Sequence, residues 1–169
     1  MPRAVILSVA VWLGLLSHGL LQASLDLPVG ANPPALETPH FPSRLHAFIW
    51  RNWQLVEPQR MAQLVDTSVD NIEQIALSMG LPKALPASPT MRERGYITLI
   101  RRNWHLLPYD QLLSLLDMTA EELAYTLRED DFLFIKLGRL KPKCAPLRYQ
   151  EPDQATRQRA AQIKGLVQH

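Results

Sequence analysis

The residues of this 169-residue chain best suited to chemistry are one indole and a short basic run. Trp50 is the tryptophan we expect to be exposed, and an exposed indole ring can stack on a sugar. Arg101, Arg102 and His105 form a basic edge, and guanidinium groups bind carboxylates and sulfates in pairs of hydrogen bonds. These four residues are therefore the candidate binding residues, for a sugar or an anion. A solvated surface is the alternative, because the acidic residues at 129–131 can pair with the basic edge.

No pattern for catalysis accompanies them. The sequence contains no His-Glu-x-x-His motif, no paired cysteines and no glycine-rich phosphate loop. Glu121 and Glu122 are adjacent, so on a helix they point about 100° apart rather than facing each other across a cleft. The histidines after residue 23 are too scattered to suggest a metal: His40, His46, His105 and His169. We therefore expect no catalytic residue, no metal and no cofactor, and an enzyme is the less favoured hypothesis.

An internal repeat with a shift of 51 residues organises the chain. Identical residues recur without a gap: Ile49, Arg51, Asn52, Trp53, Leu55, Leu64 and Asp66 become Ile100, Arg102, Asn103, Trp104, Leu106, Leu115 and Asp117. Self-similarity at a fixed period indicates one supersecondary unit used twice. Apolar residues at helical spacing predict an all-α fold of tandem trihelical, helix-turn-helix-like repeats. The recurring Trp53 and Trp104 are predicted to lie in the core.

Three helices are expected in each copy. In the first copy, the first helix covers 44–53, the second begins at Pro58, and the third begins after a cap at Thr67 or Ser68. In the second copy, Pro108 is expected to open the middle helix.

A capping box of Thr119 and Glu122 is predicted to start the third helix of the second copy. The apolar stretch 132–137 then fits a short helix or a short strand, and we favour the helix.

The start of the chain resembles a secretory signal: Arg3 precedes an apolar run at 4–16, and small or polar residues follow. Cleavage after Ala23 is favoured, with Gly19 as the other position. The alternative is an uncleaved inner-membrane anchor at 4–25. Either outcome predicts export, to the periplasm or the outside.

The predicted organisation is a signal peptide at 1–23, a Pro-rich linker at 24–43, repeats at 44–82 and 91–140 joined by a linker at 83–90, and a basic loop and helix start at 141–169. The last helix is expected to begin at Pro152 and to reach His169 without a stop signal, as in a fragment of a longer protein. Cys144 is the single cysteine, so no internal disulfide is expected.

Three segments also carry a resemblance, IRRNWHLLPY at 100–109, LREDDFLFIKLG at 127–138 and KPKCAPLRY at 141–149. From Phe48 onward the chain resembles the N-terminal helical region of large, mostly uncharacterised exported bacterial proteins. A longer part similar to a glycoside hydrolase follows in those proteins. The resemblance implies a setting of carbohydrate handling outside the cytoplasm, and it transfers no catalytic residue.

These features predict a non-catalytic accessory or interaction module of an exported, carbohydrate-active protein. Its expected partners are a downstream domain or a carbohydrate, with membrane contact only through an uncleaved N-terminal segment. The alternatives are a membrane-tethered helix-turn-helix regulator and a fragment of a glycoside hydrolase. Nucleic acid is disfavoured because the helices that would read DNA begin with carboxylates, which repel phosphates.

Overall fold

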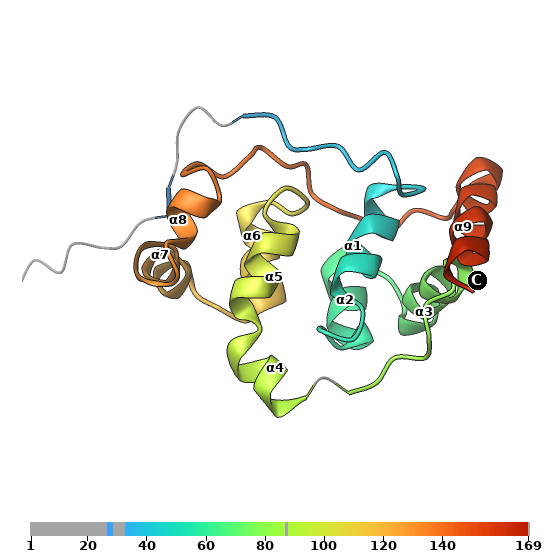
Figure 1. Ribbon diagram of the computed structural model, residues 1–169, viewed down its shortest axis with the longest axis horizontal. Helices are drawn as coiled ribbons and strands as arrows, with labels where there is room; N and C mark the ends of the chain where they lie inside the picture. The colour runs from blue at the N-terminus through green and yellow to red at the C-terminus, as the bar shows by residue number, and fades with distance from the viewer. Residues whose placement is uncertain (1–26, 29–32, 87, 169) are drawn as a thin grey trace, which may run out of the picture.

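The computed structural model describes residues 27–28, 33–86 and 88–168, and this part of the chain is all-α, as predicted (Figure 1). The predicted signal peptide, the 4–25 anchor and part of the Pro-rich linker lie outside the described residues. Among the helices that are described, none combines the length and the apolar character needed to cross a bilayer. The helices are α1 Arg44–Asn52, α2 Pro58–Val65, α3 Val69–Ser78, α4 Pro89–Arg94, α5 Tyr96–Asn103, α6 Tyr109–Leu116, α7 Ala120–Glu129, α8 Leu133–Lys136 and α9 Gln154–Val167.

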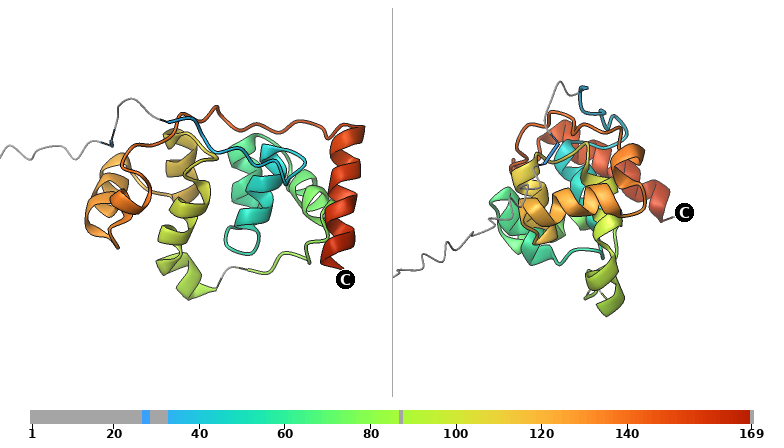
Figure 2. Two further views of the ribbon diagram at one scale, coloured as in Figure 1. Left: turned by 45° about the horizontal axis from the view of Figure 1, so that its top comes forward. Right: turned by 90° about the vertical axis from the view of Figure 1, so that its left-hand side faces the viewer.

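The helices are arranged in a row (Figures 1 and 2). Helices α7 and α8 make one end, α5 with α6 and α1 with α2 make the middle, and α3 with α9 make the other end. We call α1–α3 the first triplet and α5–α7 the second triplet. The two triplets meet where α1 packs against α5 and α2 against α6.

Helix boundaries in the two triplets correspond closely. Helix α6 begins and ends 51 residues after α2, and α7 begins and ends 51 residues after α3. Helices α2 and α6 both end on a left-handed aspartate, Asp66 with φ 61° and Asp117 with φ 59°. Ser68 and Thr119 then cap α3 and α7 by accepting a backbone N–H three residues later. The predicted capping box is confirmed, since Glu122 also accepts from the Thr119 backbone.

Three details differ from the sequence-based expectations. Helix α4 lies across the end of the predicted 83–90 linker, because Ser88 caps it and Pro89 suits its first turn. Pro108 is the cap that precedes α6 rather than its first residue. Helix α9 begins two residues later than Pro152, because the Asp153 carboxylate accepts from Thr156 N and fixes the start there.

One hydrophobic core runs through the molecule and includes the repeated tryptophans. Trp53 is 7% exposed and Trp104 is 1% exposed, which confirms their predicted burial. The stretch after α7 contains the short helix α8, so the helical alternative for 132–137 is confirmed.

A buried pair of asparagines joins the triplets within this core. Asn52 Nδ2 donates to Asn103 Oδ1 at 2.9 Å, and Asn103 Nδ2 donates to Asn52 Oδ1 at 2.7 Å. Each amide also donates to the carbonyl four residues earlier in its own helix. Both side chains are fully buried and satisfied, so this polar contact fixes how the triplets align.

Two extended segments, 33–43 and 137–153, cross the same side of the row (Figure 1). They touch through an isolated parallel bridge between Pro34 and Lys143. The later segment is attached to both triplets, because the buried Gln111 amide bonds Leu64 O and both backbone groups of Leu147. The later segment therefore links the two triplets in addition to their direct helix contacts.

Candidate functional site

A basic, aromatic pocket forms where α1 and α5 meet. It has a volume of about 480 Å³ and is lined by Phe41, Trp50, Arg51, Arg101 and Arg102. The sequence singled out Trp50, Arg101 and Arg102 as separate candidates, and the helix packing brings them together. Phe41 and Arg51 were missed, although Arg51 is the counterpart of Arg102 in the repeat.

The two central arginines exchange hydrogen bonds across the triplets. Arg51 Nη1 donates to Arg102 O at 3.1 Å, and Arg102 Nη1 donates to Arg51 O at 2.5 Å. These carbonyls belong to the last turns of α1 and α5, where the helix dipole is negative. Each guanidinium carries five N–H donors, so the exchange leaves donors of both arginines available to a ligand.

The pocket concentrates positive charge. Burial, and then the charge of Arg102, lower the pKa of Arg51 from its usual value. Among the described residues that line the pocket, none is acidic. Asp131 interacts with one of these arginines, since its pKa is lowered first by its hydrogen bond to Lys136 and to a smaller degree by the charge of Arg101. The arginines therefore repel one another with little neutralisation.

Trp50 forms the aromatic side of the pocket. Its ring packs against Phe41 with centroids 5.9 Å apart and an interplanar angle of 55°. The residue is half-buried, less exposed than the sequence led us to expect. Phe41 therefore holds the indole in place while part of its surface faces the pocket.

His105, the fourth predicted binding residue, does not line this pocket. Its Nδ1 accepts a hydrogen bond from Leu36 N at 3.1 Å, so the neutral ring carries its proton on Nε2. Burial, followed by the charges of Lys141 and Arg51, lowers its pKa. His105 is thus a neutral support for the extended segment at physiological pH.

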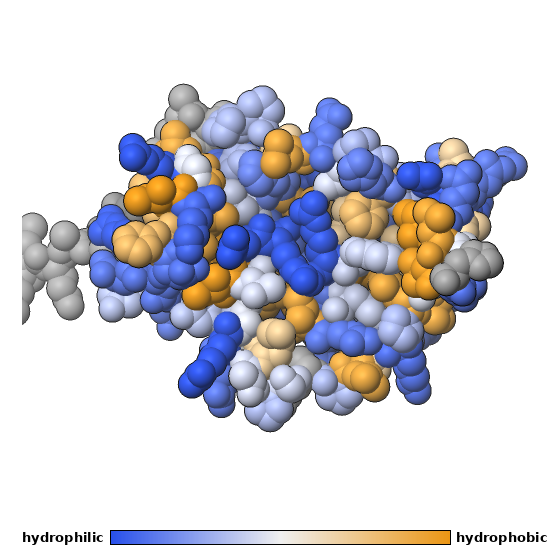
Figure 3. Space-filling model, in the orientation of Figure 1, coloured by the Kyte–Doolittle hydropathy of each residue, from blue (hydrophilic) through white to orange (hydrophobic). Residues whose placement is uncertain are grey.

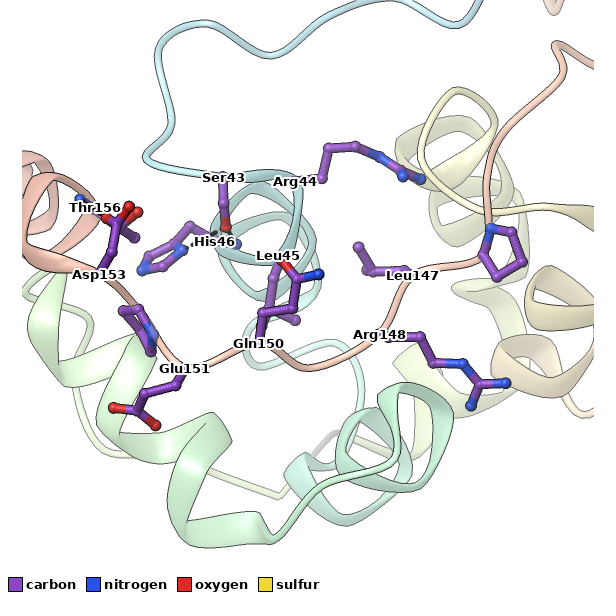
Figure 4. Close-up of a pocket in the computed structure, with 12 residues that line it drawn as sticks. Ser43, Arg44, Leu45, His46, Leu147, Arg148, Gln150, Glu151, Asp153 and Thr156 are labelled. Atoms are coloured by element: carbon purple, nitrogen blue, oxygen red, sulfur yellow. Dashed lines mark hydrogen bonds between the residues drawn. The ribbon is translucent and has the colours of Figure 1, made fainter.

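A second hollow of about 430 Å³ lies between the starts of α1 and α9 (Figure 4). Ser43 Oγ lies 2.8 Å from His46 Nδ1 there, which resembles the start of a catalytic dyad. However, Ser43 Oγ also caps α1 by accepting His46 N at 3.3 Å. Burial alone lowers the pKa of His46 to about 4, so it is a weak base, and among the described residues no carboxylate is hydrogen-bonded to its ring. This pair is explained by helix capping.

The predicted basic loop is only partly solvated. Lys141 is 2% exposed, and its ammonium donates to Trp104 O at 2.6 Å. The same ammonium lies 5.2 Å from the centroid of the Trp104 ring, within range of a cation–π contact. Cys144 is a free thiol beside it, with Nζ–Sγ at 3.6 Å. Lys141 therefore serves the core rather than a ligand.

Across the described part of the chain, no group of three histidine, cysteine or acidic side chains is placed to hold a metal ion. The pocket of Phe41, Trp50, Arg51, Arg101 and Arg102 is thus the arrangement with the clearest ligand chemistry. Comparison with known proteins finds no counterpart, since no family model, no curated protein and no solved structure matches the chain.

Proposed function

We propose that the protein is a non-catalytic binding module of an exported, carbohydrate-active protein, and that it binds an acidic carbohydrate. The binding site is the pocket of Phe41, Trp50 and the three arginines. The observation that carries this proposal is the set of three guanidinium groups beside one indole, with no acidic residue among the pocket's described lining. The resemblance of residues from Phe48 onward to exported carbohydrate-handling proteins supports the setting.

The module consists of two copies of one trihelical unit. Support comes from the 51-residue offset between the bounds of α2 and α6 and between those of α3 and α7. The reciprocal hydrogen bonds of Asn52 with Asn103 also join corresponding positions. The pocket depends on this pairing, because Trp50 and Arg101 occupy corresponding positions in the two copies.

The chemistry of an acidic sugar matches the pocket on two counts. A carboxylate or sulfate group accepts paired hydrogen bonds from guanidinium donors. An indole face gives the sugar ring an apolar surface on which to stack. Binding of an anion also offsets the repulsion between Arg51 and Arg102, which is the smaller cause, after burial, of the lowered pKa of Arg51.

The alternative of a DNA-binding regulator fits the described helices less well. The third helix of a helix-turn-helix unit must enter the major groove. Helix α3 is packed against α9, and α7 carries Glu121 and Glu122 in its first turn. Carboxylates at the start of α7 would face DNA phosphates, and the repulsion between these negative charges opposes binding.

Isothermal titration calorimetry of the full chain tests the proposed site. The probes are a tetrasaccharide of galacturonic acid and its neutral methyl ester. We expect the acid to bind and the ester to bind at least tenfold more weakly. Trp50→Ala and Arg101→Ala should each weaken acid binding at least tenfold, with helical circular dichroism unchanged.

Arg128→Ala is the matched control, because it removes an exposed arginine at the end of α7, away from the pocket lining. It should leave the affinity unchanged. Equal binding of acid and ester, an equal loss in Arg128→Ala, or no binding of either sugar would each overturn the proposal.

A further inference from the structure

Helix α9 covers the outer face of α3. Its Lys164 packs so closely on Gly80, at the end of α3, that a Cβ on that glycine would lie 3.2 Å from Lys164 Cα. Arg157, near the start of α9, lines a hollow with Asn71 and Gln74 of α3. The first triplet therefore has a helix from later in the chain packed against its third helix.

The corresponding face of α7 is open. Glu122 and Tyr125 occupy the positions of Asn71 and Gln74, and they line a shallow hollow of about 590 Å³. The lining is partly apolar, since Leu116 and Met118 also contribute to it. Tyr125 is 57% exposed. Helix α8 packs against α7, but it contributes no residue to this hollow.

In the surface view, apolar side chains gather at both ends of the row, over α7 and α8 and over α3 and α9, with strongly hydrophilic side chains between them (Figure 3). At the α7 end, Phe132 and Ile135 are 74% and 61% exposed. Phe132 also has a positive φ of 53°, a conformation that costs a bulky residue free energy.

Charge indicates what would cover this face. Three acidic residues line the hollow: Glu121 and Glu122 of α7, and Asp117, which ends α6 and also pairs with Arg60. The helix that covers α3 carries exposed basic residues: Arg157, Arg159 and Lys164. It turns the small or apolar Ala160 and Ile163 inward. Helix α9 is thus an example of a basic amphipathic helix, the kind of helix that would match the acidic, partly apolar face of α7.

We propose that the open face of α7 binds a basic amphipathic helix of another protein, in the way that α9 covers α3. This inference rests on the proposed duplication, because it takes α3 and α7 as equivalent. The partner helix carries a stripe of small and apolar residues flanked by lysine or arginine. Its basic residues approach Glu121 and Glu122, and its apolar stripe covers Tyr125 and Met118.

A labelled peptide with the sequence of Gln154–Val167 is the probe, titrated with the full chain by fluorescence polarisation. We expect saturable binding that weakens as NaCl is raised, because the contact is partly ionic. Tyr125→Lys should weaken binding at least tenfold by placing a positive charge in the hollow. Gln74→Lys, at the corresponding position on α3, is the matched control and should leave the affinity unchanged.

Three outcomes overturn the proposal. If Gln74→Lys weakens binding and Tyr125→Lys does not, the peptide has displaced α9 from α3. If the unlabelled chain self-associates in light scattering and Tyr125→Lys abolishes this, a second copy covers the face instead. Absence of binding by the peptide excludes the proposed helix chemistry.

The proposed sugar site and the proposed helix-binding face can be tested independently. Tyr125→Lys should leave binding of the galacturonic acid tetrasaccharide intact, and Trp50→Ala should leave binding of the peptide intact. A variant that loses both activities indicates unfolding, which the circular dichroism spectrum detects.

Discussion

The two triplets share helix boundaries but place their equivalent tryptophans in different polar surroundings. Trp53 Nε1 donates to Pro82 O at 2.9 Å, where the chain passes the indole after α3. Trp104 Nε1 is buried without a hydrogen-bond partner among the described residues, while Lys141 lies over its ring. The repeated residues thus determine the helices and the core, whereas the unrepeated segments that follow determine what each indole contacts.

Truncating either indole tests the shared part of this comparison. Trp53→Ala and Trp104→Ala should each lower the free energy of unfolding by about 3–5 kcal/mol, because both remove a large buried side chain. Urea denaturation followed by circular dichroism measures the loss. A change below about 1 kcal/mol in either variant would contradict the core role.

Replacement by phenylalanine tests the difference between the indoles. Trp53→Phe should cost about 1 kcal/mol more than Trp104→Phe, because only Trp53 loses a hydrogen bond and leaves the Pro82 carbonyl unpaired. The same denaturation experiment applies. Equal losses would show that the unpaired Trp104 N–H gains a partner in solution.

The asparagine pair tests whether the triplets depend on each other. Asn52→Ala or Asn103→Ala should each destabilise by about 1–3 kcal/mol, because the remaining buried amide loses its partner. The double variant should cost less than the two single changes together, which a double-mutant cycle measures. Additive losses would mean that the two amides do not interact.

The two triplets should differ in how their stability depends on pH, because His46 of the first corresponds to Ile97 of the second. The pKa of His46 is about 4 in the folded chain because of burial, against an ordinary 6.5. Between these two pH values, His46 therefore binds a proton in the unfolded chain but not in the folded chain. The resulting stability is complete above pH 6.5 and is lost as the pH falls towards 4. His46→Ile should remove this pH dependence in denaturation curves measured between those values, and an unchanged slope would assign it to other groups.

The smallest expected effect concerns the left-handed aspartates that end α2 and α6. Asp66→Gly and Asp117→Gly should each stabilise by about 0.5 kcal/mol, because glycine adopts a positive φ without a Cβ penalty. Thermal denaturation should give upward shifts of similar size in the two variants. A gain in one and a loss in the other would show that the turns differ despite their matching angles.

Local signals made the helices predictable. Apolar spacing and the Thr119 capping box depend on residues a few positions apart, whereas the burial of Trp53 and Trp104 was predicted from their recurrence at a shift of 51 residues; these predictions agree with the structure. Helix α4 was missed although Ser88 and Pro89 carry an ordinary helix-start signal. The prolines around these residues favoured a linker instead.

Contacts between distant segments could not be predicted. Trp50 and Arg101 were separate candidates, and only the crossing of α1 and α5 places them in one pocket. The burial of Lys141 depends on the fold of the later extended segment over Trp104. A basic residue in a Pro-rich loop gives no local sign of such burial, because its neighbours in sequence are not its neighbours in space.

The mutual bonding of Asn52 and Asn103 has a consequence for how chains associate. Each triplet presents an Arg-Asn pair to the other, so the contact has the reciprocal pattern of an isologous interface, and this pattern also allows closure between two molecules. The segment from α3 to α4 favours closure within one molecule by keeping the triplets at high effective concentration. Shortening that hinge until it cannot span the joint should produce a domain-swapped pair of chains with every local contact preserved.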